Sequence, residues 1–147
     1  MIRRQPTHHR VVPNESANGF CSTSQRSRKR VDEQRQLMLE DLGSVLEGEL
    51  LVDPLSTALY ASDASLYEIP PLAVARPRTR DDVVAIVRYA AEAELGVFPR
   101  GAGSGLAGGC LGPGIVVDFS RHLHHVISVD RGTVTVEPGI VRDELNR

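Results

Sequence analysis

Hydrophobic residues in the middle of the chain form one helical stripe between two short extended runs. Apolar positions recur at three- and four-residue intervals over residues 83–91, which predicts an amphipathic helix. Thr79 with Asp82 three residues later forms a capping-box pattern at its start, and Gly96 stands where a left-handed C′ residue would follow its end. The predicted apolar stripe consists of Val83, Ile86, Val87, Ala90 and Ala91.

The runs on either side of this helix predict strands. Leu72–Ala75 precedes it, and Val97–Phe98 follows it and leads directly into a glycine-rich segment. A strand, a helix and a second strand of one sheet form a βαβ unit, which is almost always right-handed with parallel strands. The glycine-rich segment therefore starts at the carboxyl end of a strand, where α/β sheets hold their ligands.

The remaining apolar runs predict shorter elements. They are a helix at 31–48 with Met38, Leu39, Leu42, Val45 and Leu46 on one face, an extended segment at 49–53, a turn of helix at 56–61, a strand at 115–119, hairpin strands at 126–129 and 133–136, and the start of a helix at 141–147. The expected fold class is α+β, with a parallel βαβ subdomain and the start of a second, antiparallel subdomain. A helix of about seven residues is not stable alone, so we expect a truncated chain.

The glycine-rich segment, Pro99–Gly109, predicts a phosphate-binding loop. Because glycine has no Cβ, successive residues can take a positive φ and turn their N–H groups into one concavity. Residues 103–108 match G-x-G-x-x-G, but the strand at 115–119 follows without a helix, which excludes the dinucleotide fingerprint. No Lys with Ser or Thr follows the last glycine, which excludes a P-loop. Apolar runs on both sides argue against a flexible linker.

Charge is distributed unevenly along the chain. The 147 residues suffice for one domain, and a net charge of −2 gives no reason to expect a nucleic-acid partner. Residues 1–30 hold six Arg, one Lys and a single acidic residue, Glu15, which predicts a disordered basic tail. We interpret this tail as a translated upstream extension, because a transit peptide would need an amphipathic apolar face.

Hydropathy and cysteine usage point to a cytoplasmic protein. The sequence holds no secretory h-region and no apolar run of about 18 residues, so no membrane span is expected. Cys21 and Cys110 lack the spacing of a metal or redox site, which favours a reduced, intracellular setting.

Three blocks in chain order resemble the FAD-linked oxidases of the vanillyl-alcohol oxidase and p-cresol methylhydroxylase type. They are VFPRGAGSGLAGG at 97–109, GIVVDFS at 114–120 and VTVEPG at 134–139. Within that superfamily, YASDAS at 60–65 and ARPRT at 75–79 are similar to the D-lactate, glycolate and D-2-hydroxyglutarate dehydrogenase branch.

The resemblance implies a domain plan and a cofactor. Residues 31–71 would form an N-terminal helix with an extended lead-in, and residues 72–147 part of an FAD-binding domain. Some members attach FAD through a histidine at the position of Ser104, so non-covalent FAD is expected here. The implied cofactor contacts are Arg100, Gly101, Ala102, Gly103, Ser104, Gly105, Gly108, Pro138 and Gly139.

The resemblance also implies an activity for the parent protein. It is the oxidation of a small D-2-hydroxy acid to the 2-oxo acid, with hydride passing to the flavin and electrons leaving to an acceptor or an iron–sulfur module. The family's substrate-binding residues lie in a later domain, so no catalytic residue is expected in this chain, which alone would be inactive.

Two other functions compete with this one. A UDP-N-acetylenolpyruvoylglucosamine reductase-like flavoprotein has the same fold, but its loop resembles Gly-x-Gly-Ser-Asn, and Gly105 replaces that asparagine. The second alternative is a fragment without function.

Several polar residues allow a structural as well as a functional role. His122, His124 and His125 lie between two predicted strands, and histidines this close in sequence seldom converge on one metal ion. Arg100 either contacts a pyrophosphate or braces the loop through carbonyl groups. Asp118 is either a ribose ligand or a structural residue at the end of a strand, and the structural role is favoured.

Overall fold

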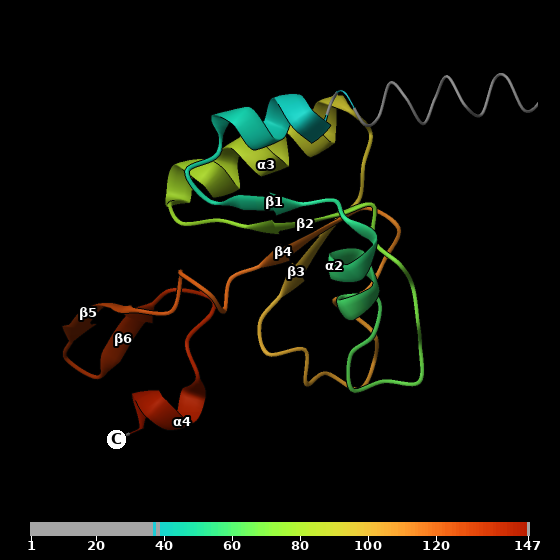
Figure 1. Ribbon diagram of the computed structural model, residues 1–147. Helices are drawn as coiled ribbons and strands as arrows, with labels where there is room; N and C mark the ends of the chain where they lie inside the picture. The colour runs from blue at the N-terminus through green and yellow to red at the C-terminus, as the bar shows by residue number, and fades with distance from the viewer. Residues whose placement is uncertain (1–36, 38, 147) are drawn as a thin grey trace, which may run out of the picture. The chain divides into compact units, whose positions relative to one another are not determined.

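The computed structural model describes residues 37 and 39–146, which form a mixed sheet, a separate hairpin and short helices (Figure 1). The four-stranded sheet has the order β1-β2-β4-β3, and the hairpin consists of β5 and β6. The strands are β1 (Glu49–Leu51), β2 (Ala73–Arg76), β3 (Val97–Arg100), β4 (Ile115–Asp118), β5 (Val126–Asp130) and β6 (Thr133–Val136). The helices are α2 (Pro54–Leu59), α3 (Arg80–Glu92) and α4 (Arg142–Leu145).

Strand β4 lies between the two strands of the βαβ unit. Both β2 and β3 run parallel to it, and Val74 and Phe98 are each paired with Val116. The predicted parallel βαβ unit is confirmed, with β2 and β3 separated by one strand position. The connection from β3 to β4 contains no helix, so the loop 101–114 starts at the carboxyl end of β3 and returns to the amino end of β4.

The core lies between this sheet and two helical segments that cover one of its faces. All four residues of β4 are buried, as expected for a central parallel strand covered by other elements. Helix α3 and the helical turns at 39–45 lie on the same side of the sheet (Figure 1). The core cluster consists of Leu42, Ala75, Ile86, Ala90, Ile115 and Val117.

The predicted capping box at the start of α3 is confirmed, and its acidic residue has further partners. Thr79 accepts from the backbone N–H of Asp82 at 3.1 Å. The Asp82 carboxylate in turn accepts from the backbone N–H groups of Arg78, Glu47 and Gly48 at 2.8, 2.9 and 3.1 Å. Burial opposes ionisation of Asp82, but these hydrogen bonds outweigh it and lower its pKa. The carboxylate therefore fixes both the helix start and the turn before β1.

The predicted stripe of α3 is only partly correct. Ile86 and Ala90 are fully buried, whereas Val87 and Ala91 are exposed. The buried face follows the four-residue row of Asp82, Ile86 and Ala90. The stripe is thus rotated relative to the prediction from hydrophobicity alone.

The predicted end of α3 is wrong. The helix ends at Glu92, and the left-handed residue is Glu94, with φ 54°, rather than Gly96. Gly96 instead lies next to the ring of Phe98, where a Cβ would approach within 2.9 Å of a ring carbon. The glycine is needed for close packing and not for a helix cap.

The N-terminal helix is described over a shorter range than predicted. Residues 39–45 are helical, with Leu39 and Leu42 buried and Val45 exposed, so Val45 does not belong to the apolar face. The predicted helix start at 31, Met38 and the predicted tail at 1–30 lie outside the described residues.

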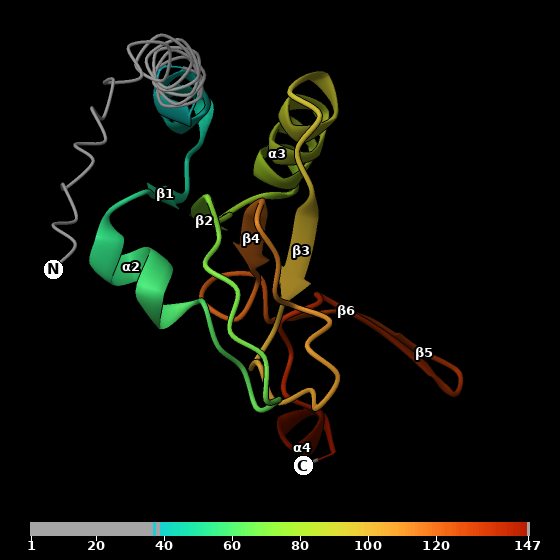
Figure 2. The ribbon, with the colours of Figure 1, turned by 90° about the vertical axis from the view of Figure 1, so that its right-hand side faces the viewer.

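The hairpin has the predicted position and extends away from the sheet in the side view (Figure 2). Gly132 occupies its turn with φ 81°, a conformation that favours glycine. The register shifts between Val126 and Ser128, so a bulge interrupts the pairing near the base of β5. Among the described residues, no helix combines the length and the apolar character needed to cross a membrane.

Candidate functional site

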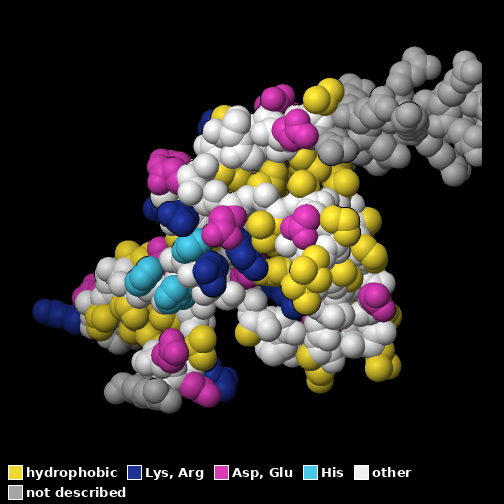
Figure 3. Space-filling model, viewed as in Figure 1, with side chains coloured by type: hydrophobic (Ala, Val, Ile, Leu, Met, Phe, Trp, Pro, Cys, Tyr) yellow, Lys and Arg dark blue, Asp and Glu magenta, His cyan; other side chains and the backbone are white. Residues whose placement is uncertain are grey.

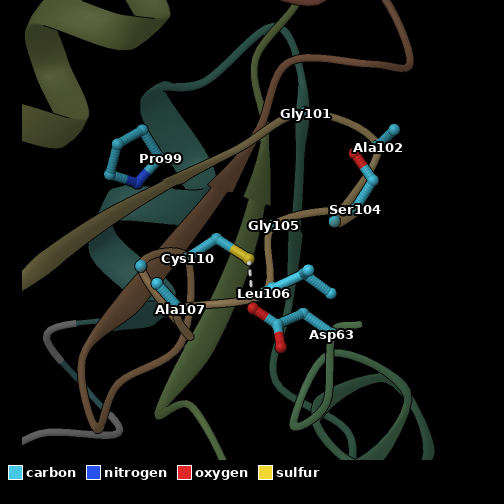
Figure 4. A pocket seen from close by; sticks show the side chains of 11 residues that line it. Asp63, Pro99, Gly101, Ala102, Ser104, Gly105, Leu106, Ala107 and Cys110 are labelled. Carbon is cyan, nitrogen blue, oxygen red and sulfur yellow. Dashed lines mark hydrogen bonds between the residues drawn. The ribbon is translucent and has the colours of Figure 1, made fainter. Parts of the chain in front are cut away.

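The glycine loop after β3 lines a first pocket of about 420 Å³ (Figure 4). Residues 101–107 line this pocket together with Asp63 and Cys110. The thiol of Cys110 donates to the Asp63 carboxylate at 3.3 Å. Burial raises the pKa of Cys110, and the Asp63 hydrogen bond adds to it, so the thiol keeps its proton.

A second pocket of about 520 Å³ lies between the same loop and the segment that follows the hairpin. Gly101, Ala102 and Ser104 line both pockets. Residues 138–142 form the opposite wall of the second pocket. The start of the loop therefore contributes to both pockets.

The loop glycines differ in what requires them. Gly103 and Gly108 have φ values of 68° and 69°, which favour glycine. Gly101 and Gly105 have no such angle, but a Cβ on either would meet nothing within 4 Å. These two glycines line a pocket and leave open space beside the backbone.

The segment 60–65 holds the loop in place and is called here the brace. Arg100 Nη1 donates to the carbonyl of Ser62 at 2.9 Å, and the backbone N–H of Ala64 donates to the carbonyl of Gly103 at 3.0 Å. The Arg100 guanidinium also lies 5.1 Å from the ring centre of Tyr60. Of the two roles considered for Arg100, the structure shows the carbonyl contact, made to the brace rather than to the loop itself.

Three other predicted contact residues have different surroundings. Gly108 lies against the ring of Tyr67, where a Cβ would approach within 2.8 Å, and it lines neither pocket. Pro138 and Gly139 line the second pocket. A Cβ on Gly139 would collide with the carbonyl of Phe119, so this turn also requires glycine for close backbone approach.

A polar network that the sequence did not indicate lies at the carboxyl end of β4. The Tyr60 hydroxyl donates to Asp118 Oδ2 at 2.5 Å and accepts from Nε and Nη2 of Arg76, both at 3.1 Å. Arg76 also pairs with Glu49 at 3.2 Å. Ser120 Oγ donates to Asp118 Oδ1 at 2.6 Å. Asp118 therefore has protein partners on both oxygens, which agrees with the structural role favoured for it.

The histidines follow β4 in the connection to the hairpin, on the face shown in Figure 3. His124 and His125 are stacked, with ring centres 4.7 Å apart, and His125 Nδ1 lies 2.9 Å from a carboxylate oxygen of Glu137. The His125 backbone N–H donates to the same oxygen, and these contacts lower the pKa of Glu137. No group of three potential metal ligands occurs within the described part of the chain.

Comparison with known sequences gives one family. Residues 71–147 match the family described as FAD binding domain. The chain is 41% identical over 92 residues to D-2-hydroxyglutarate dehydrogenase of Escherichia coli. This aligned region covers 59% of this chain and 9% of that protein. It is 32% identical over 93 residues to the glycolate oxidase subunit GlcD of Bacillus subtilis, covering 60% of this chain and 20% of that protein.

Solved structures of low sequence identity share the fold. Alkyldihydroxyacetonephosphate synthase superposes with a TM-score of 0.65 at 21% identity, over 75% of this chain and 24% of that one. The 4-ethylphenol oxidase of Gulosibacter chungangensis superposes with a TM-score of 0.56 at 19% identity, over 74% of this chain and 23% of that one.

The chain belongs to the FAD binding domain family, and its cofactor is FAD. The expected resemblance to FAD-linked oxidases and the expected fold class are therefore confirmed. The chain spans about a tenth of the length of the E. coli relative that it matches.

Proposed function

We propose that this chain provides the diphosphate-binding part of an FAD-dependent enzyme that oxidises a small D-2-hydroxy acid to the 2-oxo acid. The relatives named above act, by their names, on D-2-hydroxyglutarate and on glycolate, which are both 2-hydroxy acids. FAD would supply the hydride acceptor. We also propose that electrons leave to a separate acceptor or iron–sulfur module, and that the enzyme works in the cytoplasm.

The open space beside Gly101 and Gly105 carries this proposal. A phosphate group can approach a backbone N–H closely only where no Cβ stands in the way, and both glycines line the first pocket. Charge-assisted hydrogen bonds from backbone N–H groups contribute about 1.5 to 3 kcal/mol each. The residues present thus fit a dinucleotide with a diphosphate.

The remaining contacts follow from the two pockets that share the loop. Ala102 and Ser104 line both, so backbone and hydroxyl donors of this segment would reach the diphosphate from either side. Pro138 and Gly139 would contact the cofactor from the opposite wall of the second pocket. Ser104 has no nucleophilic ring nitrogen that could form a covalent bond to the isoalloxazine, so we propose non-covalent binding.

The roles of Arg100 and Gly108 are indirect in this proposal. Arg100 would hold the brace against the loop, and Gly108 would allow the loop to pass Tyr67. We assign no residue of this chain to the chemical step, because substrate recognition would lie in other parts of the full-length protein.

The proposal is tested by adding one methyl group to the open wall of the first pocket. Gly101→Ala should leave the melting temperature of the cofactor-free chain nearly unchanged, because the new Cβ meets no neighbour. FAD affinity, measured by calorimetric titration, should fall at least tenfold if one charge-assisted bond is lost. Gly43→Ala is the matched control, since its Cβ would make only ordinary contacts with Leu50 far from the loop.

Equal FAD affinity of Gly101→Ala and wild type would show that the loop is a structural turn and does not bind the diphosphate. Colour that stays with the protein after denaturation of the full-length enzyme would contradict non-covalent binding.

A further inference from the structure

Ser120 lies where the polar network around Asp118 reaches the second pocket. Its Oγ donates to Asp118 Oδ1 at 2.6 Å, and its backbone N–H donates to the same oxygen at 2.9 Å. The other oxygen of this buried carboxylate accepts from Tyr60. Since carboxylate oxygens accept hydrogen bonds, the single hydroxyl proton of Ser120 is committed to Asp118.

A hydroxyl whose proton is committed presents only lone pairs to its other neighbours. Ser120 lines the second pocket together with His124 and the loop residue Ser104. A phosphate oxygen placed against Ser120 would bring two acceptors together. A ligand hydroxyl or amine at the same point would instead make a hydrogen bond.

We propose that Ser120 Oγ accepts a hydrogen bond from a donor group of FAD, a sugar hydroxyl or the adenine amine, and that Tyr60 is a positioning residue for this contact. The inference rests on the proposed function, since FAD is the ligand. The two pockets then differ in their hydrogen-bonding roles. Backbone N–H groups of the loop would donate to the diphosphate oxygens, and Ser120 Oγ would accept from a donor group of FAD.

Tyr60 acts through Asp118. Two nitrogens of Arg76 donate to the Tyr60 oxygen, so its own proton points to Asp118 Oδ2. Burial raises the pKa of Tyr60, and the hydrogen bond to Asp118 raises it further, so the phenol remains a donor. With Oδ2 engaged, Oδ1 is the oxygen that receives Ser120, and the hydroxyl is held in one orientation.

The test compares FAD titrations of the full chain with Ser120 varied. Ser120→Ala should raise the dissociation constant about 3- to 10-fold, as expected for the loss of one neutral hydrogen bond. Ser120→Thr keeps the hydroxyl and should stay within about twofold of wild type. Ser44→Ala, which removes an exposed hydroxyl that donates to the carbonyl of Asp41, is the matched control and should leave the dissociation constant unchanged.

FAD binding by the wild-type chain distinguishes the donor contact at Ser120 from the proposed function. A wild-type chain that binds no FAD would overturn both. Wild-type binding together with unchanged or tighter binding by Ser120→Ala would overturn only the donor contact.

Two half-cofactors locate the donor. ADP carries the ribose and adenine with a diphosphate, and FMN carries the ribityl hydroxyls with a phosphate. Weaker binding of ADP by Ser120→Ala would assign the donor to the adenosine half, and weaker binding of FMN to the ribityl half. Wild-type affinity for both would contradict a direct contact.

The positioning role of Tyr60 is tested by a double-mutant cycle. Tyr60→Phe should weaken FAD about 2- to 5-fold in the wild-type background and should have no further effect once Ser120 is Ala. A general structural role would weaken FAD equally in both backgrounds, which would reject the positioning role. A positioning role and a general structural role of Tyr60 both predict a lower melting temperature for Tyr60→Phe, so the melting temperature does not distinguish the two roles.

Discussion

Glycine is required for opposite reasons at the edge of the sheet, where the loop 101–114 ends, and in the part of this loop that lines the pockets. At Gly114, directly before β4, a Cβ would collide with the carbonyl oxygen of Gly96. At Gly101 and Gly105 it would meet nothing within 4 Å. Backbone already fills the space in the sheet, whereas the loop leaves space that we assign to FAD. Substitutions in the sheet should therefore change stability, and substitutions in the loop should change cofactor affinity.

A large difference is expected between two glycine-to-alanine variants. Gly114→Ala forces the backbone of two neighbouring segments apart and should lower the free energy of unfolding by about 3 kcal/mol. The free energy of unfolding of Gly105→Ala should stay within about 0.5 kcal/mol of the wild-type value. Urea unfolding of the cofactor-free chain measures both. Similar losses for the two variants would break the distinction between sheet and loop.

A pair of large apolar residues sharpens the comparison. Ile86 is fully buried against the sheet, whereas Leu106 in the loop is 80% exposed. Ile86→Ala should cost about 2 to 5 kcal/mol through lost burial and the cavity left behind. Leu106→Ala should cost less than about 0.5 kcal/mol. A loss above 1 kcal/mol at Leu106, on the same urea scale, would mean that the loop packs against the rest of the protein more tightly than its exposure indicates.

Asp82 near the sheet and Asp63 near the loop both have lowered pKa values, but we expect Asp82 to contribute more to stability. The lowered pKa of Asp82 makes its contribution to stability fully present above the unfolded value of about 3.9, and this contribution is lost as the pH falls through the folded value. Asp82→Asn should cost about 1 to 3 kcal/mol at neutral pH, and the difference in unfolding free energy from wild type should narrow as the pH falls below about 4.

Asp63 provides the comparison in the loop region. The hydrogen bonds from Ser65 lower its pKa, but Asp63 is only half-buried, whereas Asp82 is buried. Asp63→Asn should therefore change the pH profile of unfolding less than Asp82→Asn does. The opposite order, in urea melts at several pH values, would show that the Asp63–Cys110 contact is the stronger constraint.

Smaller effects are expected at two of the left-handed positions, one in each region. The sheet region places Glu94 at φ 54° after α3, and the loop places Gly103 at φ 68°. Glu94→Gly should raise the free energy of unfolding by about 0.5 to 1 kcal/mol, and Gly103→Ala should lower it by about 1 kcal/mol. Calorimetric melting of the cofactor-free chain would show the two signs. A melting temperature that falls for Glu94→Gly would contradict strain at that residue.

Local patterns in the sequence were sufficient for much of the fold and for the loop. The capping box of Thr79 and Asp82, the strand before the glycine segment and the hairpin turn at Gly132 each depend on a few neighbouring residues. Such features are visible in sequence because their hydrogen bonds and backbone angles are set within one turn or one strand. The same holds for the position of the loop, since glycine spacing and flanking apolar runs are both local.

The tertiary structure alone decided which distant residues meet. The position of β4 between β2 and β3, the brace on the loop, and the network of Arg76, Tyr60 and Asp118 join residues far apart in the chain. The same applies to the end of α3, where packing of Gly96 against Phe98 leaves the left-handed turn to Glu94. Hydrophobic periodicity marks a buried face, but hydrogen-bond partners and close backbone contacts depend on how the segments pack in space, and spacing along the chain does not determine that.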